Sequence, residues 1–144
     1  MSTATARAPA EWPRFLGALR RARARLSEDP AARLSLAQYL LVEPLLDAPT
    51  RSVGELAASA GVASPTATRM LDGLERDGHV QRETAAHDRR CVELRLTSNG
   101  RTIVAAERAR FQAKGAQLFA ALEPGERAHA ARLLGRLAEL MEEL

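Results

Sequence analysis

The charged tripeptide Asp88-Arg89-Arg90 lies between two segments that predict β-strands. Residues 92–97 alternate apolar and polar side chains, as half-buried strands do, and residues 79–84 supply the second strand of a hairpin. An arginine on such a narrow ribbon fits the minor groove of DNA, where negative potential is concentrated. A carboxylate two residues earlier can orient its guanidinium by a charge-assisted hydrogen bond. Without a neighbouring DNA-binding helix, a solvated hairpin tip is the better interpretation.

A predicted helix that starts at Ser64 and ends before Gly78 supplies such a neighbour. Ser64 is a good N-cap, Pro65 suits the first helical position, and Gly78 stops the helix. The face predicted to be buried consists of Ala67, Met70, Leu71 and Leu74. The opposite face carries Pro65, Thr66, Thr68, Arg69, Asp72, Gly73 and Arg76.

The N-terminal end of this helix has the chemistry of a DNA-reading helix. Threonine hydroxyls bond bases or phosphates, an arginine such as Arg69 can bind guanine O6 and N7, and a helix N-terminus favours phosphate. An ordinary exposed helix face explains the same residues equally well when they are taken alone.

A short helix before it completes a helix-turn-helix pattern. Ser52 and Glu55 have the spacing of a capping box, and Gly61 can end the helix in a left-handed turn. Its apolar stripe is Val53, Leu56, Ala57 and Ala60. Because the helix pair is followed directly by the hairpin, we interpret the whole stretch as a DNA-binding unit.

The same residues resemble the MarR-type (multiple-antibiotic-resistance regulator) winged-helix transcription factors. The most specific parts of the resemblance are residues 53–57, 64–78, 88–90 and 96–101, and it extends over about the whole chain. It implies an obligate homodimeric repressor in which Arg90, oriented by Asp88, enters the minor groove and Thr66, Thr68 and Arg69 read the major groove. The full set expected to contact double-stranded DNA is Ser64, Pro65, Thr66, Thr68, Arg69, Asp88, Arg89 and Arg90.

The predicted fold is mainly α-helical with a small β-hairpin wing, an α+β fold. We expect a winged helix-turn-helix over residues 49–98, a helical dimerisation region from 11–48 and 99–144, and a mobile tail at 1–10. Pro44 interrupts an apolar helix over residues 36–46, where we expect a kink or an early stop. Glu123 is a weak N-cap for the last helix.

Apolar stripes at both ends of the chain predict how two copies associate. One stripe is Trp12, Phe15, Leu16, Leu19, Ala22 and Leu26, and the other is Leu133, Leu134, Leu137, Leu140, Met141 and Leu144. Each can be intrachain core, but pairing with a symmetry mate explains both. A two-fold dimer requires a pseudopalindromic site with half-sites about 10 base pairs apart.

Composition limits the function. The 144 residues suit one domain, the 46% hydrophobic content is enough for a core, and the single cysteine excludes an internal disulfide. The net charge of +3 is modest, so the DNA argument depends on the placement of charge. With no signal peptide and no apolar run near 18 residues, we expect a cytoplasmic protein that does not enter membranes.

No cofactor or catalytic chemistry is expected. The sequence has no glycine-rich phosphate loop, serine elbow or credible Cys/His pair, so an enzyme is not predicted. His79, His87 and His129 lack the spacing of metal ligands.

The resemblance also implies an effector, a small aromatic carboxylate bound between the dimer helices and the winged domain. Candidate lining residues are Trp12, Arg14, Phe15, Tyr39 and Phe111, with Arg14 pairing the carboxylate and Tyr39 donating a hydrogen bond. Each apolar member is equally explained as core, and Arg14 as a surface charge.

Two alternatives remain open. A winged helix can act as a protein-interaction module, which would show a weaker dependence of binding on salt than phosphate contacts do. A redox-responsive regulator is the other, because His87, Arg89 and Arg90 lie near Cys91 and could lower its pKa.

Overall fold

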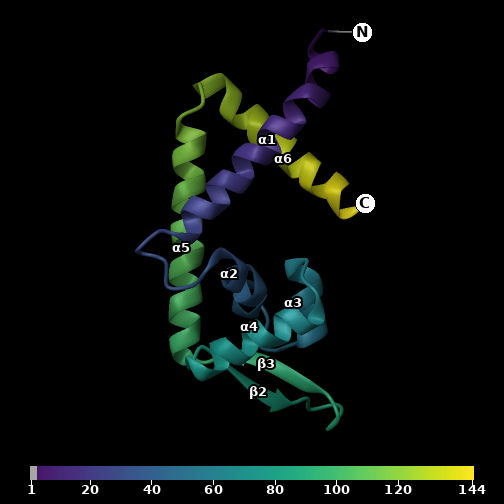
Figure 1. Ribbon diagram of the computed structural model, residues 1–144, viewed down its shortest axis with the longest axis vertical. Helices are drawn as coiled ribbons and strands as arrows, with labels where there is room; N and C mark the ends of the chain where they lie inside the picture. The colour runs from purple at the N-terminus through teal and green to yellow at the C-terminus, as the bar shows by residue number, and fades with distance from the viewer. Residues whose placement is uncertain (1–2) are drawn as a thin grey trace. The chain divides into compact units, whose positions relative to one another are not determined.

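The computed structural model describes the backbone of residues 3–144 and the side chains of residues 7–144. Six α-helices, one 3₁₀ helix and three strands occur in that part of the chain (Figure 1). In order they are α1 (Thr3–Ser27), α2 (Leu36–Val42), η1 (Glu43–Leu46), β1 (Arg51–Ser52), α3 (Val53–Ala60), α4 (Ser64–Arg76), β2 (Val80–Thr84), β3 (Val92–Leu96), α5 (Ser98–Ala120) and α6 (Pro124–Glu142).

The chain divides into two compact units, Met1–Glu107 and Arg108–Leu144, and the boundary falls inside α5. The predicted mainly helical fold with a hairpin wing is confirmed. The segment expected to be a tail is helical from Thr3 onward, which is a correction for residues 3–10. Ala8 and Ala10 have high helix propensity, and the helix also contains Pro9 and Pro13.

The first unit contains a small antiparallel sheet with the strand order β1-β3-β2. β2 and β3 form the predicted hairpin, with Val80 opposite Leu96 and Thr84 opposite Val92. The third strand, β1, was not predicted, because its two residues are too few to show an alternating pattern. Val92 is the first residue of β3, next to the wing tip, and is 47% exposed, so its predicted burial is wrong.

The core of this unit lies where α2, α3, α4 and the sheet meet. Its members, which are at most 3% exposed, are aliphatic: Leu34, Leu41, Val42, Leu45, Leu56, Ala57, Ala67, Leu71, Leu74, Val80, Ala85, Leu94 and Val104. The predicted buried faces of α3 and α4 are therefore confirmed for Leu56, Ala57, Ala67, Leu71 and Leu74. Burial of each leucine or valine side chain contributes about 1.5 to 3 kcal/mol. This packing fixes α4 on α3 and β2.

Pro44 ends α2, as its position predicts. The α-helix stops at Val42 and the chain continues as the 3₁₀ helix η1 with Pro44 in its first turn, where no backbone donor is required. Ser35 caps the start of α2 by accepting a hydrogen bond from the Gln38 amide at 3.1 Å.

The end of the sheet is joined tightly to the start of α5. Thr97 Oγ1 donates to the Gly78 carbonyl at 2.6 Å and accepts from the Gly100 amide at 2.9 Å. Gly100 is buried, and a Cβ atom there would overlap the His79 carbonyl. The Arg101 guanidinium donates to the carbonyls of Leu45 and Leu46, at 3.4 and 3.2 Å. The first turn of α5 thus holds both ends of the segment that contains α3, α4 and the sheet.

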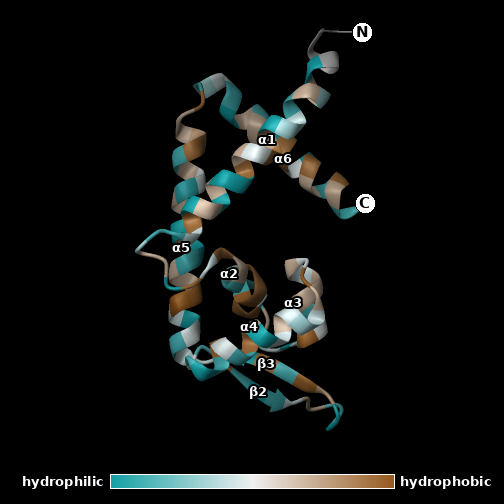
Figure 2. Ribbon diagram, viewed as in Figure 1, coloured by the Kyte–Doolittle hydropathy of each residue, from teal (hydrophilic) through white to brown (hydrophobic). Residues whose placement is uncertain are grey.

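In the second unit, α6 leaves its apolar stripe uncovered. None of the described residues of α6 is buried, and its leucines are between 43% and 47% exposed. Figure 2 shows the hydrophobic residues of α6 in brown. Glu126 stabilises the start of this helix by accepting a hydrogen bond from the Glu123 amide at 3.1 Å. That bond compensates in part for the weak cap predicted at Glu123.

Gly100 provides a test of the joint between the sheet and α5. Gly100→Ala should lower the free energy of unfolding by about 1 to 3 kcal/mol, because the methyl group must displace the backbone of His79. The matched control is Gly115→Ala in the same helix, where nothing lies within 4 Å of the added atom. It should gain up to about 1 kcal/mol in helix propensity. Urea denaturation measures both, and equal effects of the two substitutions would refute the steric argument.

Candidate nucleic-acid interface

α3 and α4 meet through a three-residue turn that glycine makes possible. Gly61 has a φ of 65°, in the left-handed region, and the Val62 amide donates to the Ala57 carbonyl at 3.0 Å. Ser52 caps α3 by accepting from the Glu55 amide at 3.1 Å, but the reciprocal half of the predicted capping box is absent. The Glu55 carboxylate instead pairs with Arg51 at 3.1 Å.

The N-terminus of α4 differs by one residue from the prediction. Ala63 is the N-cap and makes no side-chain hydrogen bond, so Ser64 lies at the first helical position and Pro65 at the second. This position tolerates proline, because the first amides of a helix have no intrahelical acceptor. The Ser64 hydroxyl is consequently not engaged in capping and is exposed together with Thr66, Thr68 and Arg69. The helix presents exposed hydroxyls, a guanidinium and unpaired amides at one end.

The wing tip is folded around Asp88. The Ala85 amide donates to the Cys91 carbonyl at 2.9 Å, and the Cys91 amide donates to the Asp88 carbonyl at 3.0 Å. Asp88 Oδ1 accepts from the backbone amide of Arg90 at 2.9 Å and lies 3.5 Å from its Nε. Hydrogen bonding from the Arg90 amide lowers the pKa of Asp88, so this carboxylate is ionised at neutral pH.

Arg90 projects from this turn into solvent, with its side chain 93% exposed. Arg89 beside it is exposed as well. The shorter contact of Asp88 is with the backbone amide, so the carboxylate fixes the course of the chain at Arg90 and only secondarily its guanidinium. The hairpin extends away from the helix pair (Figure 1).

One arginine that the sequence analysis left without a role connects α4 to the wing. Arg82, in β2, pairs with Asp72 at 2.6 Å and with Glu75 at 3.0 Å. In the sequence, Asp72 and Glu75 lie three residues apart on one helix, where a single basic side chain can pair with both. Their partner, Arg82, lies on another element. No periodicity connects residues 72 and 82.

Comparisons with known proteins agree with this geometry. Residues 34–92 match the model of the MarR family. An uncharacterized HTH-type transcriptional regulator of Bacillus subtilis, YhbI, is 27% identical over 109 residues, which cover 76% of this chain and 71% of YhbI. Among solved structures, the transcriptional repressor CouR bound to a 23-mer DNA duplex is 31% identical, with a TM-score of 0.71 and coverage of 91% of this chain and 95% of that one.

The chain belongs to the MarR family. Wild-type MarR of E. coli is also similar, at 25% identity and a TM-score of 0.73, with coverage of 87% of this chain and 95% of that one. The protein is therefore a MarR-family transcriptional regulator, and the prediction that it is not an enzyme is supported by this membership.

Residues predicted to bind an effector are in different environments in this MarR-family chain. Trp12 and Phe15 are 40% and 49% exposed, with ring centroids 6.0 Å apart, whereas Tyr39 is buried. Arg14 is exposed and pairs with Glu11 at 3.3 Å. Phe111 belongs to the second unit, where the Arg110 guanidinium lies 4.6 Å from its ring centroid. Their role as a ligand site remains a prediction.

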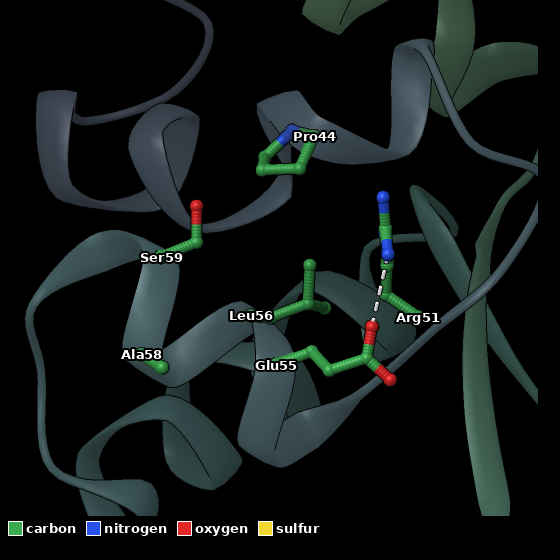
Figure 3. Close-up of a pocket in the computed structure, with 6 residues that line it drawn as sticks. All are labelled: Pro44, Arg51, Glu55, Leu56, Ala58 and Ser59. Atoms are coloured by element: carbon green, nitrogen blue, oxygen red, sulfur yellow. Dashed lines mark hydrogen bonds and ion pairs between the residues drawn. The ribbon is translucent and has the colours of Figure 1, made fainter.

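A surface depression of about 370 Å³ occurs elsewhere, between η1, β1 and α3 (Figure 3). It is lined by Pro44, Arg51, Glu55, Leu56, Ala58 and Ser59, and includes none of the five predicted effector residues. The Arg51–Glu55 ion pair lies at one side and satisfies both charges internally. The depression therefore offers no unpaired charge to a carboxylate.

Cys91 is exposed at the wing, but its surroundings oppose the predicted reactivity. The Asp88 carboxylate, 3.6 Å from the sulfur, raises the pKa of the thiol, and Glu93 adds to the effect. The expectation that His87, Arg89 and Arg90 lower this pKa is wrong, because the Asp88 carboxylate has the largest effect and raises it. A raised pKa reduces the thiolate fraction on which oxidation depends.

Further chemistry is limited in the described part of the chain. Residues 7–144 include no group of three or more His, Cys, Asp or Glu side chains suited to a metal ion. No helix of that part is long and apolar enough to cross a membrane.

The pKa of Cys91 can be tested through its rate of alkylation by iodoacetamide. We expect the rate to rise with pH to a midpoint above the ordinary thiol value of about 8.5. Asp88→Asn should move the midpoint to lower pH, because it removes the largest cause of the shift, and Glu93→Gln should move it less. A wild-type midpoint below about 8.5 would mean that the pKa of Cys91 is lowered, which would again favour redox sensing.

Proposed function

We propose that this MarR-family protein is a homodimeric repressor that binds a pseudopalindromic DNA site. The observation that carries the proposal is the pairing of two exposed reading elements on one core: the N-terminus of α4, with Ser64, Thr66, Thr68 and Arg69, and the wing tip with Arg90. The DNA-bound repressor CouR, the 31% identical relative, supports it. Because chromosomal DNA is the proposed ligand, the proposed place of action is the cytoplasm.

In this proposal α4 reads the major groove. Its exposed N-terminal residues offer hydroxyl and guanidinium donors to base edges, while Pro65 and the free amides approach the phosphate backbone. Arg89 and Arg90 are the proposed contacts to the adjacent minor groove and its phosphates, with Asp88 supporting Arg90 through the backbone.

Selection of binding sites from random DNA is the direct test. An enriched pseudopalindrome with half-sites about 10 base pairs apart is the expected result, and affinity should fall steeply with salt. If no duplex is enriched and the protein instead binds a protein partner with an affinity that depends little on salt, the protein-interaction module is favoured.

Arg90→Ala should weaken binding to the selected duplex by about 1 to 3 kcal/mol and leave the melting temperature nearly unchanged, since the side chain is exposed. Asp88→Ala should cause part of that loss. Arg136→Ala in α6 removes the same charge from an exposed ion pair that is not among the proposed DNA contacts and is the matched control. Gel-shift titration measures all three. Wild-type affinity in Arg90→Ala would remove the wing from the interface.

The proposed dimer rests on the uncovered apolar stripes of α1 and α6. Leu16 and Leu19 of α1 are 42% and 54% exposed, and Leu137 and Leu140 of α6 are 44% and 43% exposed. Exposed apolar stripes of this length are a feature of association surfaces. The proposed division of roles gives dimerisation to residues 11–48 and 99–144 and DNA binding to 49–98.

Leu137→Glu should convert the dimer to monomer, because a charge would be buried in the proposed interface. Ala128→Glu, exposed and on the opposite side of α6 by helical spacing, is the control and should leave assembly intact. Sedimentation at micromolar concentration distinguishes them. A wild-type monomer, or a Leu137→Glu dimer, would disprove the proposed interface.

The proposed effector is a small aromatic carboxylate that lowers DNA affinity, with Trp12, Arg14, Phe15, Tyr39 and Phe111 as its site. Linkage then requires that DNA lower the affinity for the effector by the same factor. Calorimetry with a panel of such acids, with and without the selected duplex, measures this factor. Arg14→Ala and Tyr39→Phe should reduce it and leave ligand-free DNA binding intact. Equal acid affinity in both conditions would exclude the coupling for the acids tested.

A further inference from the structure

Arg82, on strand β2, makes hydrogen bonds to two residues of α4. Its Nη2 donates to Asp72 Oδ1 at 2.6 Å and its Nη1 donates to Glu75 Oε2 at 3.0 Å. Its side chain is 28% exposed, against 52% for Asp72 and 42% for Glu75. The two acceptors lie three residues apart, nearly one helical turn, so the pair of bonds restrains rotation of α4 about its axis.

Asp72 also has basic neighbours on its own helix. Arg69 precedes it by three residues and Arg76 follows it by four, which are the spacings at which helical side chains meet. In the structure Arg82 holds the Asp72 carboxylate, and Arg69 has no ion-pair or hydrogen-bond partner among residues 7–144. Arg69 is thereby kept available at the exposed end of α4.

Charge balance gives Arg82 a second effect. α4 carries two carboxylates, Asp72 and Glu75, on the helix proposed to enter a groove lined by phosphates. Uncompensated, each would repel the phosphate backbone, and Asp72 would compete with DNA for Arg69. One guanidinium in contact with both carboxylates reduces the repulsion and the competition together.

We propose that Arg82 is a positioning residue for DNA recognition, which holds the carboxylates of Asp72 and Glu75 and thereby leaves Arg69 free for DNA. The inference rests on the proposed DNA-binding function and deepens it, because it assigns specificity to a residue that is not itself a DNA contact.

The test uses the full-length protein and the duplex that the wild type selects from random DNA. Arg82→Met should weaken binding about tenfold, within the range for loss of one DNA contact. The triple variant Arg82→Met, Asp72→Ala, Glu75→Gln should recover to within about threefold of wild type, since no carboxylate then remains to capture Arg69 or repel phosphate. Arg82→Lys, which can pair with one carboxylate, should be intermediate.

Arg95→Met is the matched control. Arg95 lies on the same wing and pairs with Glu83 at 3.3 Å, so the substitution removes an equal charge without touching α4. Its effect on affinity should be at most about twofold. Thermal melting of each variant shows whether it is folded. If the role of Arg82 were purely structural, the melting temperature would fall together with DNA affinity, and the triple variant would not restore binding.

Combination with Arg69→Ala provides the decisive readout. If Arg82 acts through Arg69, Arg82→Met should weaken DNA binding little further in an Arg69→Ala background. If the two residues act independently, the fold-losses of affinity in the single variants should multiply in the double variant. If Arg82 contacts phosphate itself, the triple variant stays weak and the salt slope falls by about one, which overturns the inference. If the wild type selects no duplex, the proposed function fails; if it does and Arg82→Met binds normally, only the role of Arg82 fails.

Discussion

The packing of α4 against α3 and β2 is the interaction on which the other features depend. Leu71 and Leu74 are fully buried, and Val80 at the start of β2 is 2% exposed. DNA offers its major and minor grooves at a fixed separation, so a helix end and a hairpin tip can read both only if their spacing is fixed in the protein. Burial of aliphatic side chains supplies that rigidity without constraining the residues at either tip.

Rigidity at the core and freedom at the tips have separate physical origins. The guanidinium of Arg90 is exposed, yet the backbone beneath it is fixed by three hydrogen bonds within the turn 85–91. At α4 the buried Ala67 anchors a turn whose hydroxyls and Arg69 face solvent. Donors that are held in place but not engaged lose little conformational entropy when they bind.

The joint at the start of α5 connects this reading unit to the rest of the chain. Thr97 bonds the turn after α4, Gly100 allows the His79 carbonyl to lie against α5, and Arg101 holds the end of η1. Because these contacts involve both the beginning and the end of the reading segment, a change in the direction of α5 would move that segment as a body. This is the kind of element through which the proposed effector would act on DNA affinity.

Sequence by itself determined the local features of this protein. The apolar spacing of Leu56, Leu71 and Leu74, the glycine at position 61 and the proline at position 44 act over one or two helical turns, so pattern alone located α3, α4 and the end of α2. The helix-turn-helix and wing motifs together, over residues 53–57, 64–78, 88–90 and 96–101, indicated the family.

Only the tertiary structure decided the contacts between elements. The two-residue strand β1 exists because β3 offers it an edge, and Cys91 has a raised pKa because the turn brings the Asp88 carboxylate to its sulfur. Arg82 reaches Asp72 because α4 packs on β2, not because of any spacing in the chain. Such contacts depend on packing between segments, and the periodicity of a single segment carries no information about them.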